Sequence, residues 1–274
     1  MRGVLSSRWM VLPVLAVALL LLGIGIGRDY RLKHEDNDAM HAAFARNHVA
    51  AGLAATKAHD AYVNPRNGRV SFYAHHPPGC GLLLAGAFAV TGNDSPAVVR
   101  STAVASTLLA LVVLWWMVHR EAGPETALVA AAFFAIVPQA AFYGRMVNHE
   151  VLALPAVIIM VDRYFATARG GGWRGAAAMI ASAAVGALCG WITFFAIAAC
   201  AAHALLSVRR PEAYPAAARA LALLGASGAA LFAADLFHIA WVRSGDLSDL
   251  SVIFSKPPTR TVSYWPDLMA VQAL

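Results

Sequence analysis

Runs of close to 20 consecutive apolar residues recur along this chain, and they restrict its fold more than any other feature. Each run is long enough to cross about 30 Å of hydrocarbon as a helix. Of the 274 residues, 59% are hydrophobic and only 13% are charged, whereas a soluble domain carries about a quarter charged residues. The sequence therefore predicts an all-α polytopic membrane protein.

The formal net charge of +6 comes from basic residues that mostly lie in short segments flanking the apolar runs. This placement is typical of residues that set membrane topology. No basic stripe is interleaved with aromatic residues, so we expect no nucleic-acid partner. Cys80, Cys189 and Cys200 have neither metal-like spacing nor the even number of a disulfide framework, and we expect them to be small buried residues.

The positive-inside rule predicts about seven spans and a cytoplasmic N-terminus. The first span is expected over Trp9–Gly27; this apolar run is longer than the ~7–15 residues typical of a signal peptide, which is the competing interpretation. The polar segment from Arg28 to about Pro78 then lies outside. Gly79–Val90 is short for a span and is expected to be an interfacial helix. The other predicted spans are Ser95–Val118, Glu125–Tyr143, Val151–Ala168, Ala176–Leu188, Trp191–Leu206 and Ala220–Trp241.

This topology gives one transmembrane module, residues 1–243, with an outer loop over 28–94 that carries juxtamembrane helices. Residues 244–274 are expected to begin a second outer loop. Because the sequence stops at Leu274 within that loop, we expect it to be a truncated form of a longer chain.

An acidic group, Glu35-Asp36-Asn37-Asp38, opens a predicted helix over Ala39–Ala54. In that helix Met40 and Phe44 share one side, while His41 and His48 share another, as in an amphipathic helix on a membrane surface. The acids can serve as caps that complement the helix dipole. They can also hold a carboxylate just above the bilayer to take a proton from an acceptor hydroxyl, and the two roles do not exclude each other.

Two further segments carry grouped polar residues. In the first, His75-His76-Pro77-Pro78, the prolines can start the interfacial helix, and the histidines are either ligands of a metal or phosphate or plain surface residues. The second, Gly144–Glu150, is either a polar helix boundary or part of a site. The sequence lacks a Walker loop and the GxSxG, HExxH and CxxC motifs, so it does not support a nucleotide site, a serine hydrolase or a zinc protease.

Taken in order, these segments resemble the lipid-dependent glycosyltransferases of the GT-C fold. The resemblance is to the bacterial branch of the family that includes protein O-mannosyltransferases and the aminoarabinose transferase of lipid A. It covers roughly residues 9–170. The matching pieces are Glu35–Ala39, Ala45-Arg46-Asn47, His75–Pro78, Arg100 and Gly144–Glu150.

The resemblance implies a membrane glycosyltransferase that moves a sugar from a polyprenyl-phosphate carrier to an acceptor hydroxyl, with inversion. It implies action on the periplasmic face of the bacterial inner membrane, with a divalent metal as a possible cofactor. The base is expected to be Asp36, with Glu35 and Asp38 as alternatives. The positions expected to bind the substrates are His75, His76, Arg145, His149, Glu150, Arg46 and Asn37. The sugar and the acceptor stay open, and a transporter subunit or a non-catalytic scaffold is the alternative function.

Overall fold

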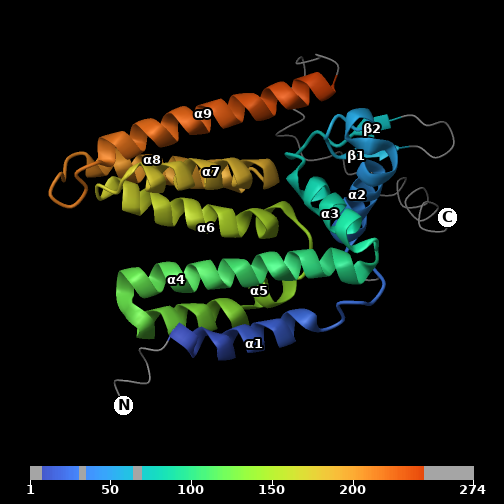
Figure 1. The fold of residues 1–274 in the computed structure, drawn as a ribbon, viewed down its shortest axis with the longest axis horizontal. Coiled ribbons are helices and arrows are strands. Elements are labelled where there is room, and N and C mark those ends of the chain that lie inside the picture. Colours follow the sequence, from blue (N-terminus) through green and yellow to red (C-terminus); the bar gives the residue numbers. More distant parts are fainter. Residues whose placement is uncertain (1–7, 31–34, 64–69, 244–274) are drawn as a thin grey trace.

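The computed structural model describes residues 8–30, 35–63 and 70–243. Long helices lie side by side and roughly parallel in a bundle, and a smaller group of elements gathers at one end of it (Figure 1). We call this end the α2/α3 end, after the helices Asp36–Ala55 (α2) and Gly79–Thr91 (α3). The predicted outer segment 244–274, together with Arg2 and His34, lies outside the described residues.

The bundle begins with a 3-10 turn, η1 (Arg8–Met10), and α1 (Val11–Gly23). A long helix, α4 (Pro96–Ile136), follows the α2/α3 end and is broken at Gly123, whose φ of 87° lies in the left-handed region that favours glycine. The chain reverses at this break, so α4 consists of two antiparallel limbs (Figure 1). The reversal lies between the predicted spans Ser95–Val118 and Glu125–Tyr143. The later helices are α5 (Pro138–Tyr143), α6 (His149–Ala168), α7 (Trp173–Cys189), α8 (Ile192–Ser207) and α9 (Ala217–Val242).

The outer surface of the bundle is apolar. Large side chains such as Phe133, Phe195 and Phe237 are 67%, 71% and 75% exposed, which suits hydrocarbon rather than water. Within the described residues, α4, α6 and α9 are long and apolar enough to cross a membrane, while α1, α3, α7 and α8 are shorter apolar helices. The chain is thus a helical membrane protein, as predicted, and the number of seven spans stays a prediction.

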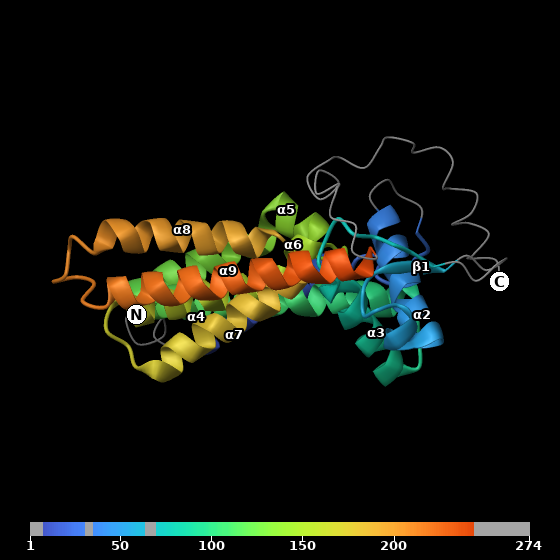
Figure 2. The same cartoon turned by 90° about the horizontal axis from the view of Figure 1, so that it is seen from above.

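Three basic connections between the long helices gather at one end of the bundle. The turn at Gly123, the α6–α7 connection and the α8–α9 connection all lie at the end of the bundle opposite α2 and α3 (Figures 1 and 2). The basic residues in or beside them are Arg120, Arg169, Arg174, Arg209, Arg210 and Arg219. The polar segment and the basic connections therefore occupy opposite ends of the bundle, an arrangement consistent with the topology expected from charge.

Small residues allow the helices to approach closely, which is the usual basis of helix packing in a bilayer. Ala127, Ala131 and Ala135 of the second α4 limb pack in one cluster with Leu111 and Trp115 of the first limb and with α1. A second cluster joins α6, α7, α8 and α9.

At the α2/α3 end, two short strands, β1 (Ala61–Val63) and β2 (Val70–Phe72), pair antiparallel with Tyr62 opposite Ser71. A buried cluster that includes Leu84 of α3 and Val99 of α4 joins α2 and α3 to α4 and α6. The bounds of α3 agree with the predicted helix Gly79–Val90, and α2 contains the predicted helix Ala39–Ala54.

The predicted face pattern of α2 is wrong in one respect. His41 and His48 were expected on a separate polar side of a surface helix, but they are only 1% and 3% exposed. They turn inward because the segment after α2 folds back and places Asp60 beside both imidazoles.

Candidate functional site

The acidic group of α2 divides into one exposed and two buried carboxylates. Asp36 is exposed, and its Oδ1 accepts a hydrogen bond of 3.1 Å from the backbone N–H of Asn37. Glu35 is 2% exposed and lies 2.7 Å from Arg28 and 3.3 Å from Arg100. Glu35 also occupies the N-cap position without making a side-chain cap hydrogen bond. Its carboxylate therefore binds arginine rather than the helix terminus.

Asp38 links α2 to the segment that precedes α6. Its side chain is fully buried, with one oxygen 3.5 Å from the guanidinium of Arg100. The other oxygen accepts a 2.6 Å hydrogen bond from the backbone N–H of Val147. Burial raises the pKa of the Asp38 carboxyl to about 6, opposed by the Val147 N–H and by Arg100. The acidic group of α2 and the segment Gly144–Glu150 thus meet at the Asp38 carboxylate.

Arg100 organises the buried part of this site. It is 1% exposed and donates to the carbonyl oxygens of Gly25 at 3.3 Å, of Ile26 at 3.1 Å and of Arg28. A guanidinium has five N–H donors in a fixed plane, so it can bind carbonyls and carboxylates together. Arg100 therefore ties the chain leaving α1 to the acidic group of α2.

Arg145 adds a third guanidinium to the same region. It is half-buried and donates to the carbonyl oxygen of Ile24. Burial lowers the pKa of Arg145, and the charges of Arg28 and Arg100 lower it further. Arg28, Arg100 and Arg145 thus lie near the two buried carboxylates, Glu35 and Asp38. A group of guanidiniums suits a phosphate group.

The histidine pair lies against the start of α6. The rings of His76 and His149 stack at a centroid distance of 3.9 Å and an interplanar angle of 12°. The backbone oxygen of His75 accepts a 2.7 Å hydrogen bond from the indole of Trp191. His149 is 6% exposed, whereas its neighbour Glu150 is exposed. The predicted residues of the segments His75–Pro78 and Gly144–Glu150 therefore lie together, with His149 buried and Glu150 at the surface.

Asn37 and Arg46 lie on the surface of α2. Asn37 is exposed beside Asp36. Arg46 forms an ion pair with Asp94, just beyond α3, and both side chains remain partly open to solvent. The charges of Arg46, Asp38 and Arg100 all influence the pKa of Tyr30, so Arg46 lies in the same part of the site, nearer the surface.

Sequence reasoning missed Asp60. Its carboxylate is fully buried and lies 3.8 Å from His41 Nδ1 and 3.5 Å from His48 Nε2. Burial raises the pKa of Asp60 to about 6, and the hydrogen bond to His48 opposes this shift. The only local signal was a single aspartate just before a strand-forming triplet, and that pattern does not reveal that the chain folds back onto the preceding helix.

We expect Gly81→Ala to disturb this cluster strongly. A Cβ at Gly81 would lie 2.0 Å from Asp60 Oδ1 and 3.3 Å from His48 Nε2, so the buried carboxylate would have to move. Overpacking of this kind costs about 1–3 kcal/mol. Gly86→Ala in the same helix is the matched control, because nothing lies within 4 Å of its Cβ. Thermal unfolding in detergent should show a lower midpoint for Gly81→Ala alone, and equal midpoints would contradict the packing described.

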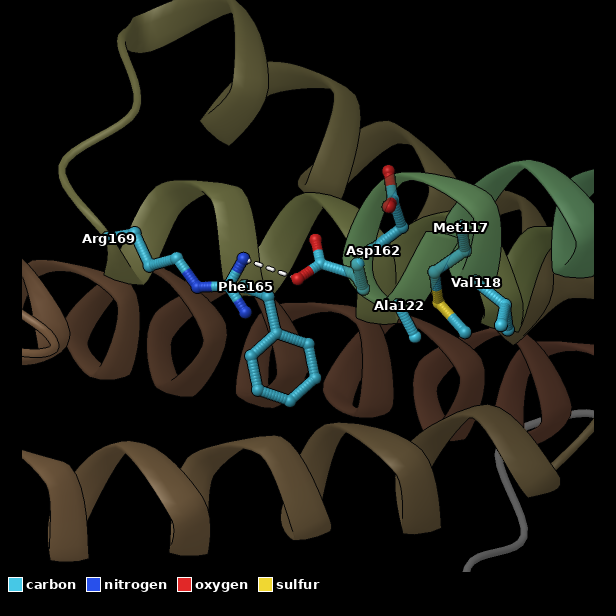
Figure 3. A pocket seen from close by; sticks show the side chains of 7 residues that line it. Met117, Val118, Ala122, Asp162, Phe165 and Arg169 are labelled. Carbon is cyan, nitrogen blue, oxygen red and sulfur yellow. Dashed lines mark hydrogen bonds and ion pairs between the residues drawn. The ribbon is translucent and has the colours of Figure 1, made fainter. Parts of the chain in front are cut away.

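A pocket of about 290 Å³ lies at the opposite end of the bundle (Figure 3). The side chains of Arg169 and Glu121 pair across it at 2.6 Å. The other lining residues are Met117, Val118, Ala122, Asp162 and Phe165. None of the predicted site residues lines this pocket.

A sequence profile of the family described as dolichyl-phosphate-mannose-protein mannosyltransferase matches residues 75–234. The chain belongs to this family. The match starts at His75 and includes Arg100 and Gly144–Glu150, which confirms the family resemblance seen in the motifs. The acidic group of α2 lies before the matched residues. No curated protein sequence matches the chain significantly.

Proposed function

We propose that this chain is a membrane glycosyltransferase that transfers a sugar from a polyprenyl-phosphate carrier to an acceptor hydroxyl at the α2/α3 end. The observation that carries the proposal is the exposed Asp36 next in sequence to Glu35, whose carboxylate pairs with Arg28 and Arg100. A base for the acceptor and positive charge for the leaving phosphate are the two elements that such a transfer needs. Membership of a family of membrane glycosyltransferases supports this function over a transporter subunit or a scaffold.

Asp36 is the carboxylate best suited to act as base. A general base must come within hydrogen-bond distance of the hydroxyl that it deprotonates. Asp38 and Glu35 are 0% and 2% exposed and are held by Arg100, so an acceptor reaches neither of them without a rearrangement. Asp36 is exposed on the first turn of α2. Attack by the deprotonated oxygen on the anomeric carbon, with the lipid phosphate leaving from the other side, inverts that carbon.

The leaving phosphate is assigned to the arginine group. Arg28 is exposed and Arg145 is half-buried, whereas Arg100 is 1% exposed, so Arg28 and Arg145 are the members open to a ligand. Asn37 lies beside the base, while His75, His76 and Glu150 line the neighbouring surface and His149 positions His76 by stacking. Arg46 is assigned to the acceptor side, because its guanidinium lies at the surface and is partly open to solvent.

We propose that the α2/α3 end faces the periplasm of a bacterial inner membrane and the basic connections face the cytoplasm. Labelling of single cysteines tests this orientation. Asn93, just after α3, is exposed, and Glu212 is exposed in the α8–α9 connection at the opposite end. The cysteine is placed at Asn93 rather than at the neighbouring Gly92, because Gly92 has a φ of 63° and any side chain there would be strained.

With an impermeant maleimide on intact spheroplasts, we expect Asn93→Cys to react and Glu212→Cys to react only after lysis. The native Cys80, Cys189 and Cys200 are buried and give little background. Labelling of Glu212→Cys in intact spheroplasts, with Asn93→Cys protected, would reverse the orientation and remove the proposed access to the carrier.

A turnover assay tests the activity itself. Membranes containing the chain are incubated with a panel of radiolabelled sugars on polyprenyl phosphate and, in parallel, with the matching nucleotide sugars. We expect label to leave the lipid fraction for at least one polyprenyl-phosphate donor, and no consumption of nucleotide sugars. Use of a nucleotide sugar, or no turnover of any lipid donor, counts against the proposed reaction.

A further inference from the structure

A buried group of potential metal ligands lies beneath the proposed site. His41 of α2, Cys80 of α3 and His149 of α6 each place a ligand atom within 4.8 Å of those of the other two. All three side chains are buried, at 1%, 0% and 6% exposure. They come from three helices that are distant in sequence, so their convergence is a product of the fold.

The hydrogen bonds around His149 leave it ready to bind a cation. Its Nδ1 lies 2.8 Å from the carbonyl oxygen of Cys189, which can only accept, so Nδ1 carries the proton; Cys80 Sγ lies 3.2 Å from the same nitrogen. The lone pair is then on Nε2, which is buried and has no hydrogen-bond partner in the described structure. An imidazole that donates one N–H to a carbonyl and directs its other nitrogen to a metal is the usual arrangement at zinc sites.

A carboxylate lies close to His41. His41 Nδ1 faces Asp60 Oδ2 at 3.8 Å, longer than a hydrogen bond, and a small shift would give the histidine–carboxylate pairing found behind metal ligands. Asp60 Oδ1 faces His48 Nε2 at 3.5 Å, and the Thr56 hydroxyl lies 2.8 Å from His48 Nδ1. The Thr56 hydroxyl donates to the carbonyl oxygen of Gly52 at 3.1 Å, so it accepts from His48 Nδ1. His41 and His48 thus both lie against the Asp60 carboxylate.

A buried carboxylate adds negative charge beside this group. Asp60 is fully buried, 3.8 Å from His41 and 3.5 Å from His48. A buried carboxylate without a compensating cation is unfavourable. One divalent cation would balance the charges of Asp60 and an ionised Cys80.

We propose that His41, Cys80 and His149 bind a divalent cation of the zinc class, with Asp60 orienting His41. The sulfur and nitrogen donors select a borderline-soft metal over magnesium or calcium, which prefer oxygen ligands. On binding, Cys80 Sγ forms a bond to the metal and its thiol proton passes to solvent. The ion joins α2 and α3 to α6 and so holds the outer helices on the bundle. This role is independent of the proposed sugar transfer.

Metal content of the purified chain in detergent tests the proposal. After dialysis against excess Zn²⁺ and then metal-free buffer, we expect about one zinc ion per chain by mass spectrometry, held by three protein ligands with a water in the fourth position. Replacement by Co²⁺ should give a thiolate-to-cobalt charge-transfer band and the visible bands of a tetrahedral site. Cys80→Ser should lose the charge-transfer band and most of the bound metal.

Three variants keep the test specific. Cys189→Ser and Cys200→Ser also remove a buried thiol, at 3% and 7% exposure, but neither thiol belongs to the group, so both should bind zinc as the wild type does. Asp60→Asn should retain the site and weaken zinc binding by roughly 10–100-fold, the usual effect of losing an orienting carboxylate. A folded wild-type chain that takes up no zinc or cobalt overturns the proposal. Equal metal content in the wild type and in Cys80→Ser overturns it as well.

Discussion

Replacing Asp36 by Asn should reduce sugar transfer by about 10²–10⁴-fold, the range expected when a general base is removed. The change keeps the size and the hydrogen-bonding ability of the side chain and removes only its capacity to take a proton. Because Asp36 is exposed on the first turn of α2, folding should be affected by no more than about 0.5 kcal/mol. Initial rates of label transfer and the thermal unfolding midpoint, measured on the same preparations, separate the two effects.

Glu212→Gln is the matched control, since Glu212 is an exposed carboxylate at the opposite end of the bundle. It should transfer sugar at the wild-type rate. Normal activity of Asp36→Asn would move the base to Glu35 or Asp38. That result would also require Arg100 to release one of them during the reaction, because both carboxylates are buried against its guanidinium.

The largest loss of stability is expected from Arg100→Leu. This variant leaves the buried carboxylates of Glu35 and Asp38 without Arg100, and it leaves the carbonyls of Gly25 and Ile26 without a donor. Removing one partner of a buried ion pair costs about 3–5 kcal/mol. The thermal unfolding midpoint should fall sharply, and proteolysis should begin near the junction of α1 and α2.

Arg46→Ala provides the comparison for Arg100→Leu. Arg46 also pairs with a carboxylate, Asp94, but both side chains are partly exposed, at 34% and 54%. Such a pair contributes about 0–1 kcal/mol, so the unfolding midpoint should hardly change. Arg100→Lys should be intermediate, because it keeps the charge but cannot bind carbonyls and carboxylates in one plane. A similar midpoint for all three variants would show that the buried group has little effect on stability.

Patterns that depend on neighbouring residues could be predicted from the sequence alone. The apolar runs indicated the helical membrane fold, since a helix satisfies its own backbone hydrogen bonds in hydrocarbon. Pro78 and the break after Val90 indicated the helix that the structure has as Gly79–Thr91. The polar residues between Val118 and Glu125 indicated the reversal found at Gly123. The ordered motifs indicated the family that the profile match then showed.

Only the tertiary structure decided which of these residues meet. Asp38 and Val147 are 109 residues apart in the sequence, and Arg100 lies 65 residues from Glu35. No local periodicity records such pairs, because they depend on how α2 and α3 pack on α4 and α6. The same packing turned His41 and His48 inward and placed Asp60 between them. Composition and spacing thus determined the helices and the family, whereas long-range packing decided which carboxylates are buried and which one remains exposed.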